Sequence, residues 1–159
     1  FYLSYFYTSI HKNSVHYSPD NFSTCDLIFI PINLDDAFNY KHWTLVIINV
    51  RDRRIEYYDS CLNENADDYK AKIVTQEIQN FMTKKIPDIE KFEKRVMFSP
   101  RQNNAIDCGV FMLLNIAFKA QGLALNYDQS MIPDFRKKIA AQMVLAGLQE
   151  VQAEEVFGK

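Results

Sequence analysis

The sequence has few cysteines, few glycines and no long apolar run, and each scarcity excludes a class of protein. Its 159 residues include three cysteines and four glycines. An odd number of cysteines at wide, irregular spacing fits reduced thiols better than a disulfide framework. With three scattered histidines and neither a CxxC nor an HExxH motif, we expect no metal site and no cofactor. No apolar stretch approaches a membrane span, and no basic-then-apolar signal peptide is visible.

The charge balance is nearly neutral. A net charge of −2 gives no basis for binding nucleic acid or an anionic membrane, so we expect neither as a partner. A chain of this length forms one domain with a sizeable core, and we expect a monomer. The sequence starts at Phe1, within an apolar run and without a methionine, which indicates a fragment of a longer protein.

The apolar patterns predict an α+β domain, with strands clustered in the middle of the chain and helices on either side. Short β-branched runs predict the strands, and the charged turn 51–54 predicts a hairpin between two of them. Apolar residues that recur every three or four positions predict the helices. The expected strands are 27–32, 42–50, 55–59 and 95–98, and the expected helices are 1–10, 68–86, 108–121 and 134–156.

Each of the last three helices has an expected apolar face. These faces are Ile73, Ile78, Phe81 and Met82 in the first; Val110, Leu113, Leu114, Ala117 and Phe118 in the second; and Phe135, Ile139, Met143, Ala146 and Val151 in the third.

The stretch 100–122 has the most informative pattern. A polar loop leads into an apolar helix that begins at Cys108, with Asp107 at the N-cap position and Gly122 at its end. Backbone N–H groups and the helix dipole favour a thiolate in the first turn, and the thiolate is the nucleophilic form of cysteine. Gly109 leaves room beside the sulfur for a substrate backbone. The alternative is that Cys108 is a small buried hydrophobe.

Three more residues complete a possible catalytic group. His42 begins one hairpin strand and Asp59 ends the next, so antiparallel pairing brings both to one sheet edge, within hydrogen-bonding reach. Gln102 lies six residues before Cys108 and can present its amide N–H₂ beside the nucleophile. A thiolate, a base, an orienting acid and an oxyanion donor are the parts that a cysteine protease needs. Each residue taken alone also fits an ordinary strand-end or loop role.

Together these motifs resemble the SUMO-specific (Ulp/SENP-type) cysteine proteases, relatives of the adenovirus-type protease. The matching segments are IPIN (30–33), HWTLVIINV (42–50), IEYYDS (55–60) and PRQNNAIDCGVF (100–111). The gaps of 17 residues from His42 to Asp59 and 49 from Asp59 to Cys108 also match. SYFYTSI (4–10) resembles an early aromatic segment of the family, and DQSMIPDFRKKIA (128–140) resembles its closing helix.

The resemblance implies a papain-like fold and a role for each matched residue. His42 is the general base and acid, Asp59 orients it, Cys108 is the nucleophile and Gln102 is the oxyanion donor. Trp43 forms one wall of a narrow channel for a Gly-Gly tail. Cys25 and Cys61 match no catalytic position and are read as bystanders, and capping accounts for Asp107. Ala105 stands where the family commonly has glycine.

The implied activity is cleavage after the C-terminal Gly-Gly of SUMO or a similar ubiquitin-like modifier, in precursors or on target lysines. Residues 1–159 would be the catalytic domain without its amino-terminal segment, which carries a Trp-Leu-Asn-Asp motif in the family. The implied partners are the modifier and its conjugates, and the implied location is the nucleus or cytoplasm. Two alternatives stay open: an effector-type acetyltransferase that uses acetyl-CoA, and a non-catalytic modifier-binding module.

Overall fold

The structure is a computed structural model, and it describes residues 22, 25–34, 41–62 and 68–157 of the chain. The expected helix at 1–10 lies outside the described residues. Four strands and three helices form the described part, with two short 3₁₀ turns between them. The elements are β1 (Leu27–Asn33), β2 (Trp43–Asn49), β3 (Arg54–Tyr58), α3 (Tyr69–Met82), η1 (Ile89–Lys91), β4 (Glu93–Val96), α4 (Cys108–Ala120), η2 (Gln129–Met131) and α5 (Ile132–Phe157).

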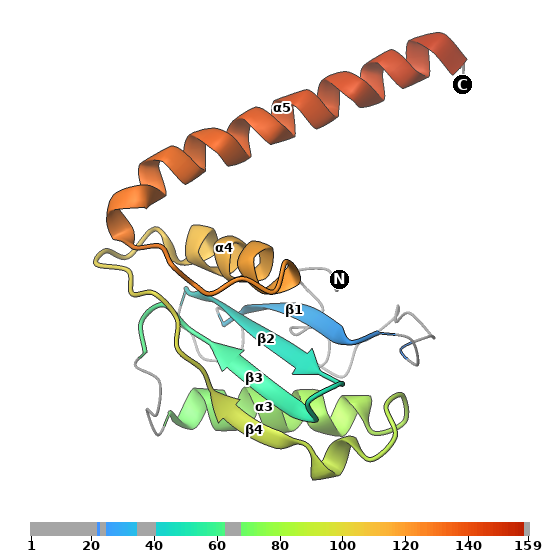
Figure 1. Cartoon of the computed structure of the whole chain (residues 1–159), viewed down its shortest axis with the longest axis vertical. Helices are drawn as coiled ribbons and strands as arrows, with labels where there is room; N and C mark the ends of the chain where they lie inside the picture. The colour runs from blue at the N-terminus through green and yellow to red at the C-terminus, as the bar shows by residue number, and fades with distance from the viewer. Residues whose placement is uncertain (1–21, 23–24, 35–40, 63–67, 158–159) are drawn as a thin grey trace.

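The four strands form one mixed sheet in the order β1-β2-β3-β4 (Figure 1). β2 pairs antiparallel with both β1 and β3, so the predicted hairpin is confirmed. β4 pairs parallel with β3 and begins two residues earlier than predicted. Its position is fixed by the partner strand, since Glu93 lies opposite Arg54 and donates its backbone N–H to Arg53. Three of the four residues of Glu93–Val96 are charged and exposed, so a search for apolar runs does not find this strand.

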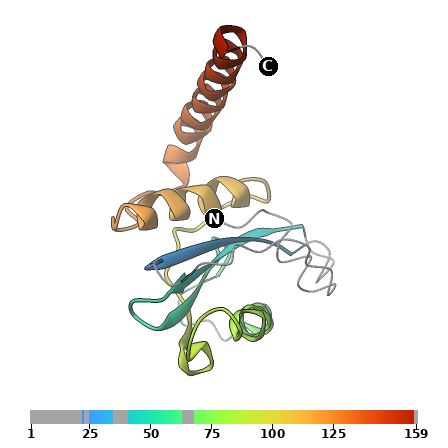
Figure 2. The same cartoon turned by 90° about the vertical axis from the view of Figure 1, so that its right-hand side faces the viewer.

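Helices cover both faces of the sheet, with α3 on one side and α4 on the other (Figure 2). This arrangement explains why β2 is apolar along its length, because both faces of a strand are then buried. Val46 and Ile48 pack in the cluster shared with α3, whereas Leu45 and Ile47 pack against α4. The predicted α+β class is therefore confirmed, and the sheet lies between a layer with α3 and a layer with α4.

α3 is shorter than predicted, and its buried face is rotated. Asp68 caps its start by accepting the backbone N–H of Ala71 at 2.9 Å. The helix ends at Met82, before Pro87, because the backbone N–H groups that follow turn back onto the last helical turn. Predicted core residues Ile78 and Met82 are buried, but Ile73 and Phe81 are only half-buried. The buried residues of the helix are Ala71, Val74, Thr75, Ile78, Gln79 and Met82.

α4 begins at Cys108 as predicted and ends just before Gly122, which adopts a left-handed φ of 69°. Other parts of the protein cover the helix on two sides, so its buried residues do not form a single stripe. Met112 faces the sheet, and Phe111 packs in a second cluster with Tyr127 and Ile132. The predicted face is correct at Val110 and Leu114 and half-buried at Phe118, but Leu113 and Ala117 are exposed.

α5 leaves the body of the molecule after its first turns (Figure 1). The predicted face holds at Phe135 and Ile139, which pack partly against α4. Met143 and Ala146 are exposed in spite of the prediction, and the side chain of Val151 lies outside the described ones. No helix among the described residues combines the length and apolarity that a membrane crossing requires.

Candidate active site

His42 and Asp59 meet at one edge of the sheet. Leu45 of β2 pairs with Tyr58 of β3, so the residues that flank these strands reach the same edge. His42 Nε2 lies 2.7 Å from Asp59 Oδ1, and both side chains are buried. The hydrogen bond expected from the hairpin is thus present. Nε2 is thus the ring nitrogen that faces the carboxylate.

The Asp59 carboxylate is held by its own strand end. Oδ1 also accepts the backbone N–H of Cys61 at 2.7 Å, and Oδ2 lies 3.5 Å from the hydroxyl of Tyr57. The backbone N–H of Leu62 donates to the carbonyl of Asp59, which closes the turn after β3. These contacts fix the carboxylate on the backbone and so fix the ring that it orients.

Cys108 lies at the first position of α4 and is 7% exposed. The backbone N–H groups of Val110 and Phe111 both donate to the carbonyl of Asp107, as expected where a helix starts. Cys108 lines a groove of about 450 Å³ that also includes Trp43. A Cβ added to Gly109 would lie 3.7 Å from Trp43 Cδ1. The indole therefore lies next to Gly109, in the same groove as the thiol.

Gln102 is anchored beside Asp59 through Ser60. The Ser60 hydroxyl donates to Gln102 Oε1 at 2.5 Å, and the backbone N–H of Gln102 donates to the Ser60 carbonyl at 3.0 Å. One hydrogen of the side-chain amide goes to the carbonyl of Asn104 at 2.5 Å. The loop before Cys108 is thus tied to the residue that follows Asp59 in sequence.

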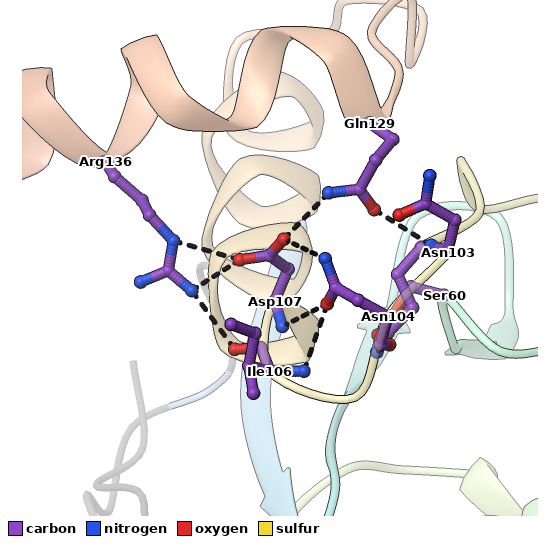
Figure 3. Close-up of polar contacts among 8 residues, drawn as sticks. Ser60, Asn103, Asn104, Ile106, Asp107, Gln129 and Arg136 are labelled. Atoms are coloured by element: carbon purple, nitrogen blue, oxygen red, sulfur yellow. Dashed lines mark hydrogen bonds and ion pairs between the residues drawn. The ribbon is translucent and has the colours of Figure 1, made fainter.

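Asp107 has a different role from the predicted cap. It occupies the N-cap position, but its side chain makes no capping hydrogen bond. Its Oδ1 accepts from Nε of Arg136 at 2.9 Å and from Nη2 of the same guanidinium group. Its Oδ2 accepts from Asn104 Nδ2 at 2.6 Å and from Gln129 Nε2 at 2.7 Å (Figure 3). The carboxylate therefore joins the loop, η2 and α5.

The same partners also hold the backbone of the loop (Figure 3). Asn104 Oδ1 accepts the N–H groups of Ile106 and Asp107 at 3.0 and 3.1 Å. Gln129 Oε1 accepts the N–H of Asn103 at 2.9 Å, and Arg136 Nη2 donates to the carbonyl of Ile106 at 3.1 Å. Each contact fixes a point between Gln102 and Cys108.

This network also keeps Asp107 ionised. Burial alone would raise the pKa of the Asp107 carboxyl group, but hydrogen bonds from Asn104, Arg136 and Gln129, with the charge of Arg136, bring the pKa below its usual value. Neither Arg136 nor Gln129 is predicted as a site residue from the sequence, although both lie in the segment 128–140, which resembles the closing helix of the family. The sequence signal that could have indicated them is the presence of a cation and a side-chain amide in the segment that follows α4.

The remaining cysteines differ in their surroundings. Cys25 and Cys61 are both half-buried free thiols, and Cys25 packs against the core under α3. Burial raises the pKa of the Cys61 thiol, and the negative charges of Asp59 and Cys108 raise it further. Cys61 also offers a ligand atom within 4.8 Å of those of His42 and Asp59, a grouping that could hold a metal ion. The sequence did not indicate this proximity of Cys61 to the His42–Asp59 pair.

A family model described as the Ulp1 protease family, C-terminal catalytic domain, matches residues 2–151. Ubiquitin-like-specific protease 1A of Arabidopsis thaliana is 32% identical over 123 residues, which cover 76% of this chain and 23% of that protein. NEDD8-specific protease 2 of Schizosaccharomyces pombe is 29% identical over 133 residues, covering 76% of this chain and 30% of that one. The chain thus spans about a quarter to a third of the length of these two relatives.

Solved structures show the same fold. A SUMO protease Ulp1 with its catalytic cysteine oxidised to a sulfonic acid superposes with a TM-score of 0.79 at 23% identity, over 92% of this chain and 69% of that one. The C-terminal Ulp1 protease domain in complex with Smt3, the yeast ortholog of SUMO, gives a TM-score of 0.69 at 23% identity, over 85% and 62% of the two chains. The papain-like α+β architecture implied by the motifs is therefore confirmed.

Proposed function

The chain belongs to the Ulp1 protease family, and we propose that it is a cysteine protease that cleaves after the terminal glycine of a ubiquitin-like modifier. The observation that carries this proposal is the buried 2.7 Å contact between His42 and Asp59, at the sheet edge that carries Trp43. Trp43 in turn lines one groove with Cys108. An imidazole oriented by a carboxylate and a thiol at a helix start are the two halves of a cysteine protease centre.

The reaction proceeds through an acyl-enzyme. His42 Nδ1 takes the thiol proton of Cys108, and the sulfur attacks the carbonyl carbon of the modifier's last glycine. The protonated ring then gives its proton to the leaving amine as the C–N bond breaks. A water molecule, deprotonated by His42, attacks the thioester and releases the modifier with a free carboxylate. The Asp59 carboxylate orients the ring and stabilises the imidazolium that forms in each half of the reaction.

Two N–H donors are assigned to the oxyanion. One is the second amide hydrogen of Gln102, whose first hydrogen goes to Asn104. The other is the backbone N–H of Cys108, because the first N–H groups of a helix have no partner within it. The anchoring of Gln102 on Ser60 and of its loop on Asp107 and Arg136 supports this assignment, since an oxyanion donor works only when it is held in place before the reaction.

Trp43 is assigned to substrate selection. Its indole stands 3.7 Å from where a Cβ of Gly109 would be, so the passage past the thiol is bounded by a flat ring. Such a passage admits a backbone without side chains, which is the chemistry of a Gly-Gly tail. We assign the tail to SUMO or a similar modifier, supported by the relative solved with Smt3, while the NEDD8-specific relative shows that the family is not confined to SUMO.

We propose that the protein acts inside the cell, in the nucleus or cytoplasm. Its substrates are modifier precursors, lysine conjugates or both. The partners are the modifier and its conjugates.

Modifiers that end in a vinyl sulfone test the proposal, because only an activated thiol held beside the bound tail adds to them. SUMO and NEDD8 probes are incubated in parallel with the full-length protein, and the adduct is mapped by mass spectrometry. We expect one adduct, on Cys108, which Cys108→Ala removes and which Cys25→Ser keeps. Acetyl-CoA in place of the probes tests the acetyltransferase alternative. Acetylation of Cys108 without a probe adduct contradicts the protease, and binding without any adduct indicates a binding module.

A further inference from the structure

We propose that His42, Asp59 and Cys61 form a binding site for Zn²⁺, which reversibly blocks the catalytic base. One ligand atom from each residue lies within 4.8 Å of the other two. The donor set is one imidazole nitrogen, one carboxylate oxygen and one thiol sulfur, all of which Zn²⁺ accepts. No such site is expected from the sequence, because the three residues do not form a compact ligand motif there.

The three ligand atoms lie close enough together for small side-chain movements to give them the spacing of a tetrahedral ion. Zinc takes nitrogen and oxygen at about 2.0–2.2 Å and sulfur at about 2.3 Å, which places its ligand atoms roughly 3.3–3.8 Å apart. His42 Nε2 and Asp59 Oδ1 are 2.7 Å apart, so they need to separate slightly when a metal ion takes the place of the hydrogen bond between them. The single proton of the neutral ring then moves from Nε2 to Nδ1. Three protein ligands leave the fourth position for a water molecule.

The backbone holds the three ligands in place before any metal arrives. Cys61 follows Asp59 by two residues, and its N–H donates to the Asp59 carboxylate at 2.7 Å. The backbone of His42 is held by the residue that follows β1, since the His42 carbonyl accepts the backbone N–H of Leu34 at 3.0 Å. Binding therefore requires small side-chain rotations and no rearrangement of the chain.

The solvent exposure of Cys61 and the charges around its thiol both indicate that a metal ion contacts this residue first. His42 and Asp59 are buried, whereas Cys61 is half-buried and can be reached from solvent. Its thiol loses one proton on binding, so the occupied site holds two negative charges, the new one on the thiolate and the existing one on Asp59. Arg101 and Lys70 face the same thiol and balance part of that charge without offering a ligand atom.

The inhibitory consequence rests on the proposed function of His42. Zinc bound to Nε2 leaves the ring proton on Nδ1, which is the nitrogen assigned to take the proton of Cys108. The imidazole then has no lone pair for the nucleophile, and the thiol stays protonated. Removing the metal with a chelator restores the base, because no covalent bond has formed.

Cobalt(II) tests the site without using the protease reaction, because a thiolate bound to Co²⁺ gives a charge-transfer absorption in the near ultraviolet. The reduced full-length protein is titrated with Co²⁺ alone. We expect a band that saturates at one equivalent, remains in Cys25→Ser and Cys108→Ser, and is lost in Cys61→Ser. Cys25 is the matched control, as it is also a half-buried free thiol. A band that survives Cys61→Ser, or that disappears in Cys108→Ser, overturns the proposal.

Competition with a chromophoric chelator then gives the Zn²⁺ affinity of the same proteins. Cys61→Ser should weaken binding by at least about tenfold, and circular dichroism with thermal unfolding should show that the variant is folded. Probe labelling of wild type should fall as Zn²⁺ occupies the site and return with chelator, and Cys61→Ser should label fully at the same Zn²⁺ concentration. Zinc binding without loss of labelling contradicts the inhibitory role. Absence of labelling in metal-free protein contradicts the proposed function, while the cobalt band still decides the site.

Discussion

Arg136 of α5 binds Asp107, the residue before Cys108, through two nitrogens of its guanidinium group. The two residues are 29 positions apart in the sequence, and Asp107 also receives hydrogen bonds from Asn104 and Gln129. This carboxylate is where the loop that carries Gln102 and the helix that starts at Cys108 are joined to the last helix of the domain. Its function in our account is to hold the nucleophile and the oxyanion donor in one geometry.

Arg136→Ala should therefore lower kcat by roughly 10- to 100-fold, because small displacements of reacting groups have effects of that size. The accompanying rise in KM should be smaller. Arg136→Lys should recover part of the loss, since lysine supplies the charge but not the two-nitrogen contact. The measurement is a kcat and KM determination on a modifier precursor. Lys137→Ala is the control, because Lys137 is exposed and, in the part of the chain that the structure describes, forms its ion pair with Asp134. A change confined to KM would make Arg136 a substrate contact of the groove that it also lines.

His42 and Asp59 should behave as one unit. We expect Asp59→Asn to lose most of the activity that His42→Ala loses, and the double variant to be no worse than His42→Ala alone. The reason is that Asp59 acts only by orienting His42 and stabilising its charged form. Turnover of the two single variants and the double variant, assayed side by side, gives the answer. Losses that multiply would mean that Asp59 has a separate role, for instance in holding the turn around Cys61.

Gln102→Ala should lower kcat by roughly 10²–10³ with little change in KM, as expected for one preorganised oxyanion donor. The charge that it stabilises exists only in the transition state. Gln121→Ala, which removes an exposed glutamine at the far end of α4, serves as the control and should leave both constants unchanged. If Gln102→Ala raises KM alone, its amide contacts the bound substrate and not the oxyanion.

Trp43 should enforce glycine at the last two positions of the modifier. Changing Gly-Gly to Gly-Ala or Ala-Gly should raise the barrier to cleavage by wild type by far more than ~1 kcal/mol, which is the usual effect of one methyl group in an open pocket. Trp43→Ala should narrow that difference while lowering the overall rate, since the wall that excludes side chains also positions the scissile bond. The assay is a matrix of both proteins against the three precursors. Similar rates of wild type on all three would assign Trp43 to packing alone.

The sheet and the His42–Asp59 pair could be predicted from the sequence because both depend on short-range rules. A hairpin with a short turn fixes which residues face each other, so the flanks of β2 and β3 had to share an edge. The bounds of α4 could also be predicted from local sequence, since Asp107 and Gly122 stand at its two ends. These features use interactions between residues near each other in the chain.

The parts that were missed depend on contacts between distant segments. The predicted buried face of α4 was wrong at Leu113 because the helix is covered by the sheet on one side and by Tyr127 and Ile132 on another. A single apolar stripe does not describe a helix that is buried on two sides. The Asp107–Arg136 contact was invisible because an aspartate before a helix already has a local explanation in capping. In the same way the neighbourhood of Cys61 follows from the turn after β3 and not from any spacing of cysteines.

The most direct test of the account is cleavage and binding measured on one variant, Cys108→Ala, in the full-length protein. The thiolate carries the covalent step, whereas affinity for a modifier comes from a wide surface away from the sulfur. We expect turnover of a SUMO precursor to disappear while the dissociation constant for mature SUMO stays within a fewfold of wild type. Residual turnover within about tenfold of wild type would contradict the assignment of Cys108 as the nucleophile.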